Sequence, residues 1–152
     1  MTISLDQLKK LREETSAGVS DCRTALEDAG GDFEKAKKLL MARGIEKAAK
    51  KEGKETHEGI IESYVHANGN VGVLVALNCE TDFVAQNDEF KKLAHEICLQ
   101  ITAMNPKNVK ELLASPYVRD AKLTISDLIK TTITKVGENI TVSRFSRLTL
   151  GE

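Results

Sequence analysis

The first third of the chain contains three short runs in which apolar residues recur every three or four positions. This spacing puts the apolar side chains on one face of a helix, and a small domain must bury that face. The apolar positions are Leu5, Leu8 and Leu11 in the first run, Cys22, Ala25, Leu26 and Ala29 in the second, and Phe33, Ala36, Leu39 and Leu40 in the third. Residues 1–45 are therefore predicted to form a domain of three helices, with Cys22 and Phe33 in its core.

Capping residues define the predicted ends of these helices. Ser4, Ser20 and Asp32 precede the three runs. Serine and aspartate are preferred N-caps because their side chains accept hydrogen bonds from unpaired backbone N–H groups. Gly30-Gly31 and Gly44 are predicted to end the second and third helices, because glycine is frequent just beyond a helix C-terminus.

Residues 46–58, EKAAKKEGKETHE, are charged and contain no large apolar side chain. This composition is typical of a helical tail that frays into a linker, here around Gly53. The lysines alternate with glutamates, which favours a solvated spacer over a phosphate-binding patch. We therefore expect a domain boundary at residues 46–58 and a second domain over residues 59–152.

Two strands joined by a tight turn are predicted at the start of the second domain. Gly59 to Ala67 and Val71 to Cys79 have strand character, and Asn68-Gly69-Asn70 between them is a strong hairpin signal, because Asn and Gly accept positive φ. In the second strand, one face carries Val71, Val73, Val75 and Leu77, and the other carries Gly72, Leu74, Ala76 and Asn78. The second face has smaller residues, so we expect it to let a helix pack closely.

The rest of the second domain carries further helix and strand patterns. Asn87 is a predicted N-cap for a helix that runs until Asn105-Pro106, and a shorter helix is predicted over Val109–Ala114. Thr124 or Ser126 is expected to begin another helix, which ends at Gly137. The apolar positions of a final strand are Ile140, Val142, Phe145, Leu148 and Leu150. This order predicts an α+β fold in which a small antiparallel sheet packs against helices.

Composition and charge narrow the class of protein. The formal net charge is −1 with 30% charged residues, so there is no basic excess of the kind that binds nucleic acid. The three cysteines are odd in number and lack a CxxC pairing, which argues against a disulfide framework and a zinc site. No apolar run approaches the ~20 residues that span a bilayer, and the N-terminus has no signal-peptide pattern. We expect a cytoplasmic, bacterial-type protein that binds neither a membrane nor nucleic acid directly.

The sequence offers little support for an enzyme. His57, His66 and His95 are too scattered for a metal site or a catalytic pair. A cluster of Cys79, His66 and Asp82 is conceivable, as in a small hydrolase or redox protein, but no nucleophile elbow supports it. There is also no Gly-rich phosphate loop. We therefore predict that the chain is not an enzyme and binds no cofactor or metal of its own.

The connection between the second strand and the long helix is the most informative segment. It reads NCETDFVAQND, Asn78 to Asp88, and places Asp82 and Phe83 where the strand breaks off and the helix begins. Connections run over the surface and often carry function. Phe83 and Val84 therefore either face a partner or close the top of the core, since Phe is often buried.

Three segments, in order along the chain, match motifs of one protein family. TSAGVSDCRTALEDAGGDFEKAKKLLMARG, Thr15 to Gly44, matches a UBA-like three-helix domain, and TDFVA, Thr81 to Ala85, matches a signature between a strand and a helix. GENITVSRFSRLTLGE, Gly137 to Glu152, matches a terminal strand. The chain thus resembles the elongation factor Ts family, the guanine-nucleotide exchange factors of elongation factor Tu. The resemblance implies that the chain binds elongation factor Tu with GDP and promotes GDP release during translation elongation.

The resemblance also implies two contact regions for the GTPase partner. The first is the connection after the first helix, with Arg12, Thr15, Ala17, Gly18 and Val19. The second contains Thr81, Asp82, Phe83 and Val84. In the family, the phenylalanine inserts between two helices of the GTPase domain, and the aspartate helps to hold the loop and disturbs the region that coordinates the nucleotide's magnesium. Ser16 stands where the family usually has glycine, and Val19-Ser20 replace a commonly methionine-rich pair, so we expect the first contact to be weaker or differently packed.

The chain departs from many relatives in its size. Those relatives carry a second core subdomain and a helical excursion, whereas this chain passes almost directly from Pro106 to Val109. Short relatives compensate by pairing, so the resemblance implies a homodimer through the sheet. One alternative function stays open, in which the chain is a UBA-like module that captures ubiquitin or a nascent chain and has no exchange activity.

Overall fold

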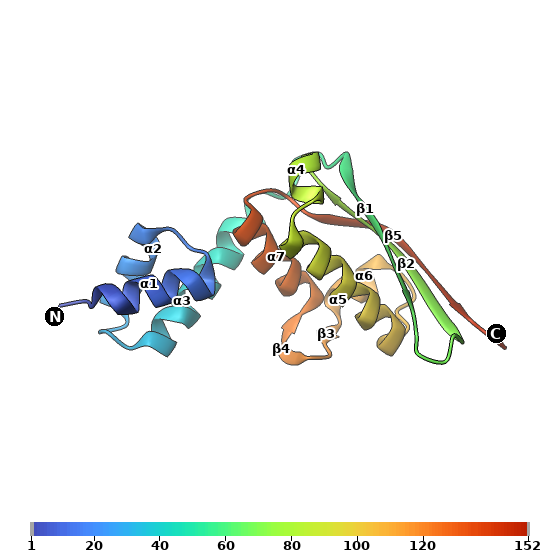
Figure 1. Cartoon of the computed structure of the whole chain (residues 1–152), viewed down its shortest axis with the longest axis horizontal. Coiled ribbons are helices and arrows are strands. Elements are labelled where there is room, and N and C mark those ends of the chain that lie inside the picture. The colour runs from blue at the N-terminus through green and yellow to red at the C-terminus, as the bar shows by residue number, and fades with distance from the viewer. Residues whose placement is uncertain (1, 152) are drawn as a thin grey trace.

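A computed structural model describes residues 2–151. A group of helices at the N-terminal end and an α+β core at the C-terminal end are joined by one long helix, and the two termini lie at opposite ends of the molecule (Figure 1). The helices of the first group are α1 (Leu5–Thr15), α2 (Val19–Asp28) and α3 (Phe33–Ala49). The predicted three helices are confirmed, and the α+β fold class is confirmed with them.

Two of the three predicted N-caps are confirmed. The Ser4 side chain accepts a hydrogen bond from the backbone of Asp6, and that of Asp32 accepts one from Lys35. The prediction for Ser20 is wrong, because α2 begins at Val19 and its N-cap is Gly18, which makes no side-chain cap. The buried residues of this group are Leu11, Cys22, Ala25, Leu26, Ala29, Ala36 and Leu40, so the apolar stripes pack together as predicted.

The predicted end of the third helix at Gly44 is wrong. α3 continues to Ala49, and Ala48 is buried in the core of the second part of the chain. Gly44 lies inside the helix on its buried side, where α3 crosses α7 (Ile125–Val136). The glycine is therefore a packing residue and not a helix stop, a distinction that local sequence signals do not make.

Three strands form the main sheet in the order β1 (Glu58–Val65), β2 (Val71–Cys79) and β5 (Thr141–Thr149), with antiparallel pairing throughout. The predicted hairpin is confirmed, and Gly69 in its turn has a φ of 72°. β3 (Pro116–Tyr117) and β4 (Asp120–Thr124) form a second, two-stranded sheet, which no pattern in the sequence predicts.

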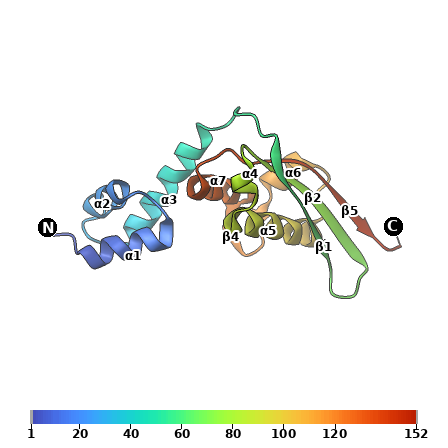
Figure 2. The same ribbon diagram turned by 45° about the horizontal axis from the view of Figure 1, so that its top comes forward.

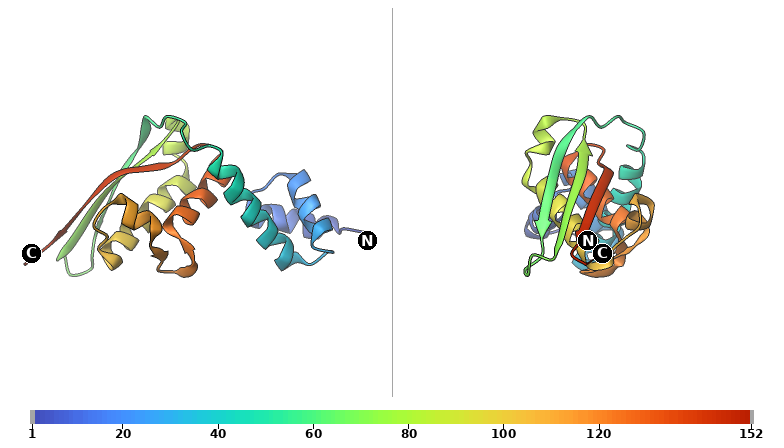
Figure 3. Two further views of the ribbon diagram at one scale, coloured as in Figure 1. Left: turned by 180° about the vertical axis from the view of Figure 1, so that it is seen from behind. Right: turned by 90° about the vertical axis from the view of Figure 1, so that its right-hand side faces the viewer.

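Helices cover one face of the main sheet. They are α5 (Asp88–Met104), α6 (Val109–Ala114) and α7, and α5 and α7 lie side by side behind the strands (Figure 3). Val73, Val75 and Leu77 of β2 are buried in this core with Phe90 and Ile97 of α5. The expectation that a helix packs on the smaller face of β2 is wrong, because burying branched side chains removes more apolar surface from water than burying Gly72 or Ala76 would.

The ends of the core helices follow their capping signals. Asn87 caps α5 and accepts a hydrogen bond from Glu89, and Asn105 ends it with a φ of 46°. Of the two candidates for α7, Thr124 is the N-cap, in a reciprocal capping box with Asp127, and Gly137 ends the helix. Within residues 2–151, no helix is long and apolar enough to cross a membrane.

Candidate functional site

The connection after β2 contains a single helical turn, α4 (Asp82–Ala85), which lies at one end of the sheet (Figure 2). The Phe83 side chain is 87% exposed, more than any other large apolar side chain among residues 2–151. Val84 and Ala85 are buried in the core. The two interpretations of the segment therefore apply to different residues, with Val84 closing the core and Phe83 pointing into solvent.

Asp82 lies beside Phe83 and is also exposed. Among residues 2–151, no hydrogen bond or ion pair engages the Asp82 carboxylate. Thr81 precedes the turn as its N-cap, and its hydroxyl oxygen accepts a hydrogen bond from the backbone N–H of Val84 at 3.4 Å. The turn thus presents a free carboxylate and an uncovered aromatic ring on a short, capped helix.

The turn is also held by the loop that follows α7, which is distant in the sequence but adjacent in space. The Glu138 carboxylate accepts hydrogen bonds from the backbone N–H groups of Glu80 and Thr81 at 3.2 and 3.0 Å, and from the Thr81 hydroxyl at 2.7 Å. In return, the Glu80 carboxylate accepts a hydrogen bond from the backbone N–H of Asn139 at 2.7 Å. The sequence alone indicates no role for Glu80, Glu138 or Asn139, because no local pattern links residues so far apart.

In the α1–α2 connection, the predicted contact residues divide into two kinds. Arg12, Gly18 and Val19 are exposed. Thr15 instead shapes the turn, since its hydroxyl donates to the Leu11 carbonyl at 2.6 Å, and Ala17 packs against the helical core. The neighbouring Ser16 has a φ of 56°, a conformation that glycine adopts more easily.

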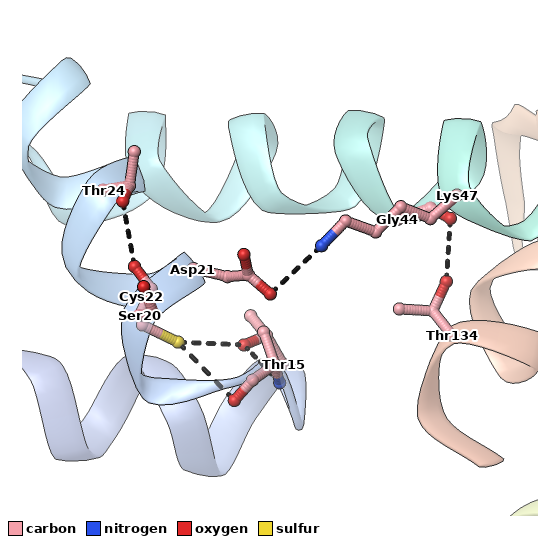
Figure 4. A network of polar contacts seen from close by, with 9 residues as sticks. Thr15, Ser20, Asp21, Cys22, Thr24, Gly44, Lys47 and Thr134 are labelled. Atoms are coloured by element: carbon pink, nitrogen blue, oxygen red, sulfur yellow. Dashed lines mark hydrogen bonds and ion pairs between the residues drawn. The ribbon is translucent and has the colours of Figure 1, made fainter. Parts of the chain in front are cut away.

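The two regions are joined through α3 and α7. The Thr134 hydroxyl of α7 donates to the Gly44 carbonyl of α3 at 2.9 Å, and Lys47 of α3 forms an ion pair with Asp21 of α2 at 3.2 Å (Figure 4). A Cβ atom on Gly44 would lie 3.1 Å from both Cγ2 and Oγ1 of Thr134, so glycine allows the two helices to approach closely. Both predicted regions lie toward the middle of the molecule and away from the two termini (Figures 1 and 2).

The segment between α3 and β1 is also tied to the core. Lys51 Nζ donates to the Gly137 carbonyl at 2.5 Å, and Asn139 Nδ2 donates to the Lys54 carbonyl at 2.9 Å. The Thr56 and Thr141 hydroxyls are 2.8 Å apart. This segment therefore follows the core surface on its way to β1.

The conceivable cluster of Cys79, His66 and Asp82 does not form. Cys79 and His66 lie at opposite ends of the β1–β2 hairpin, because Cys79 pairs with Glu58 and His66 follows the last residue of β1. Cys79 is fully buried, and burial, with a contribution from the nearby Glu138 carboxylate, raises the pKa of its thiol to about 11. A buried, protonated thiol is a poor nucleophile at neutral pH.

Comparisons with known proteins identify relatives of the chain. A sequence model of the elongation factor TS family matches residues 80–152, which begin just before α4 and include the loop that contains Glu138. The chain is 43% identical over 197 aligned positions to elongation factor Ts of Fervidobacterium nodosum, and equally to that of Coprothermobacter proteolyticus, with all of both chains covered. It is 42% identical to elongation factor Ts of Thermotoga petrophila, with 100% of this chain and 98% of the relative covered.

These alignments extend over the helical group as well as the core, so they include both predicted contact regions. They also span more positions than the 152 residues of this chain, because the relatives carry additional residues. Identity at this level over whole chains shows the family. The chain belongs to the elongation factor Ts family of translation elongation factors.

Proposed function

We propose that the chain is a guanine-nucleotide exchange factor that binds elongation factor Tu with GDP and promotes release of the GDP. The observation that carries the proposal is the exposure of Phe83 on a turn whose neighbours Val84 and Ala85 are buried. An aromatic side chain that is almost wholly in water, on a turn anchored to the core, is suited to insertion into an apolar pocket of a partner.

In the proposed mechanism, Phe83 enters between two helices of the GTPase domain, and Asp82 disturbs the region that coordinates the nucleotide's magnesium. Linkage makes the effect reciprocal, so that whatever the chain stabilises in the nucleotide-free partner is lost when GDP and Mg²⁺ rebind. The chain then acts on the partner's nucleotide and holds no nucleotide, cofactor or metal itself. It carries out no chemical reaction, so it is not an enzyme in this proposal.

The energetics require more than one contact. A thousandfold faster release corresponds to about 4 kcal/mol, at roughly 1.36 kcal/mol per factor of ten. Burial of one phenylalanine supplies about 1.5–3 kcal/mol. We therefore propose that residues 1–45 anchor the partner through Arg12, Gly18 and Val19, that residues 46–58 form the connection, and that residues 59–152 carry the wedge.

We further propose that two copies of the chain pair through the sheet. The face of the sheet opposite the helices exposes apolar side chains, namely Ile61, Val65, Leu74 and Leu148. Several exposed apolar residues on one face are typical of an interface, and closed two-fold symmetry is the commonest arrangement of soluble homo-oligomers. Light scattering is expected to give a mass near twice 16.7 kDa. A monomer that retains full exchange activity contradicts the pairing.

The decisive experiment mixes the full chain with elongation factor Tu that carries a fluorescent GDP and follows release of the nucleotide. We expect the release rate to rise and then to saturate with the concentration of the chain. Binding without faster release would favour the alternative, in which the chain is a UBA-like binding module. Proposed surroundings for this activity are the bacterial cytoplasm, with no direct contact to nucleic acid or membrane.

A further inference from the structure

The direction in which Phe83 points depends on a very short element. α4 has four residues, and helices of this length have almost no stability of their own. Its N-terminal cap is the Thr81 hydroxyl, whose bond to the backbone of Val84 is long at 3.4 Å. An exposed ring on such a turn is aimed at a partner only if the residues before the turn are fixed.

Those residues are fixed by the carboxylate of Glu138. Both of its oxygens are used, one by the backbone N–H groups of Glu80 and Thr81 and the other by the Thr81 hydroxyl. Because the Thr81 hydroxyl donates its proton to Glu138, its oxygen lone pairs are turned toward Val84. The carboxylate thus orients the cap of α4 as well as the chain that leads into it.

The hydrogen bonds run in both directions between the two loops. Glu80 accepts from the backbone of Asn139, which is 97% buried and donates its side-chain amide to the Lys54 carbonyl. Hydrogen bonds to a charged acceptor are shorter and stronger than neutral ones. The group formed by Glu80, Thr81, Glu138 and Asn139, which we call the carboxylate clasp, therefore restrains α4 by polar contacts from a loop almost sixty residues away.

We infer that Glu138 is a positioning residue for nucleotide exchange, acting on the partner through Phe83 and not by its own contact. The inference rests on the proposed function, since it concerns the aim of the proposed wedge. Its physical basis is that loss of the carboxylate leaves two backbone N–H groups and one hydroxyl to water and lets the turn adopt several orientations. Only a fraction of these would present the ring to the partner, and the exchange rate would fall to that fraction of the wild-type rate.

The test compares Glu138→Ala and Glu138→Gln with the wild-type chain in the fluorescent GDP assay. Glu138→Ala is expected to lower the maximal release rate about tenfold, consistent with loss of charge-assisted hydrogen bonds. Glu138→Gln retains an accepting oxygen, so its maximal release rate is expected to lie between those of Glu138→Ala and the wild type. Glu111→Ala is the matched control, because the Glu111 carboxylate also accepts a backbone hydrogen bond, from Lys107, but makes none with α4 or with the residues that lead into it among residues 2–151. The control is expected to exchange like the wild type.

Two further measurements separate positioning from a general loss of structure. Amide hydrogen exchange on the isolated chain is expected to accelerate over residues 81–86 in Glu138→Ala while α5 stays protected. In a Phe83→Ala background, adding Glu138→Ala is expected to lower release by less than about twofold more, since residues that act through one another have non-additive effects.

The outcomes distinguish the two proposals. If the wild-type chain fails to accelerate GDP release, the proposed function falls and the role of Glu138 falls with it. If the wild type is active but Glu138→Ala releases GDP at the full rate, only the positioning role is overturned. The positioning role is also overturned if the double variant loses the product of the two single fold-changes in release rate. It is overturned as well if amide protection in Glu138→Ala is lost in α5 together with α4.

Discussion

The two proposed contact regions are built in different ways. In the α4 turn, the exposed side chain is a large aromatic one, and the turn is held by the carboxylate clasp from a distant loop. In the α1–α2 connection, the exposed side chains are Arg12 and Val19, and the turn is shaped locally by the Thr15 hydroxyl. The first region presents most of its apolar area on the single side chain of Phe83. The second presents smaller contacts from several residues around a local turn.

This difference suggests that the two regions make different contributions to binding the partner. A single buried aromatic anchor in a pocket is sensitive to the shape of that pocket, so it discriminates between conformations of a partner. A charged residue and a small apolar residue on an open surface contribute affinity and encounter rate with less dependence on the partner's state. The α3–α7 crossing at Gly44 keeps the two regions in one arrangement, so that affinity gained at one is available at the other.

The largest effect on exchange is expected from Phe83→Ala. Truncation of a central interface aromatic typically costs about 2 kcal/mol or more, which is about a thirtyfold loss of exchange. The melting temperature is expected to stay within a few degrees of the wild type, because the ring has no core contact to lose. Val118→Ala, at another exposed apolar position, serves as the control. A collapse of the melting temperature with normal exchange by the folded fraction would assign Phe83 to the core.

A smaller effect is expected from the double substitution Arg12→Ala with Val19→Ala. Loss of two surface contacts is expected to raise the concentration for half-maximal exchange about tenfold, which is about 1.4 kcal/mol. The maximal rate should stay near that of the wild type, since the wedge is intact. Titration of the exchange rate against chain concentration separates the two parameters. A fall in the maximal rate at unchanged half-saturation would remove the distinction between anchor and wedge.

The next effect concerns the crossing that joins the regions. Gly44→Leu is expected to overpack the contact with Thr134 and to lower the free energy of unfolding by about 1–3 kcal/mol. Its effect on exchange is expected to be smaller than that of either surface change, because both surfaces keep their side chains and the other contacts between α3 and α7 still hold the two regions in one arrangement. Urea unfolding measures the loss, and Thr134→Ala in the same chain is expected to recover part of it. If Thr134→Ala recovers none of the lost stability, the overpacking in Gly44→Leu does not arise at the contact with Thr134.

Local signals account for much of the fold. Ser4, Asp32 and Asn87 act as predicted caps, and the Asn68-Gly69-Asn70 turn forms the predicted hairpin. In each case the interaction spans a few neighbouring residues, so the sequence pattern contains the information. The position of TDFVA between a strand and a helix was likewise predictable, although its resemblance to a family was needed to single out Phe83 as the contact.

Features that depend on distant partners were missed. Gly44 has the residue type of a helix stop, and only its contact with Thr134, ninety positions away, makes it a packing residue. Glu138 lies 57 residues from Thr81, so no local pattern shows that its carboxylate caps the approach to α4. The face of β2 that packs against the helices also differs from the prediction, because burial of the larger valine side chains removes more apolar area from water than close packing on small residues would. Long-range contacts therefore determine how the site is held, while local patterns determine where it lies.

The smallest effect on exchange is expected at Cys79, close to the clasp but buried beneath it. Burial raises the pKa of this thiol above its ordinary value of 9.0, to about 11, and its Sγ donates to the Thr81 carbonyl at 3.1 Å. Because the folded-state pKa is the higher one, stability is unaffected below pH 9 and falls as the pH rises from 9 toward 11.

Cys79→Ser can make the same hydrogen bond, so it is expected to leave exchange at neutral pH unchanged and to weaken the alkaline loss of stability. Unfolding measured from pH 7 to pH 11 checks the second point, and thiol alkylation of the native chain at pH 7 should be slow. Rapid alkylation at pH 7 together with loss of exchange in Cys79→Ser would instead make the thiol part of the function and would count against a wedge that acts through Phe83 alone.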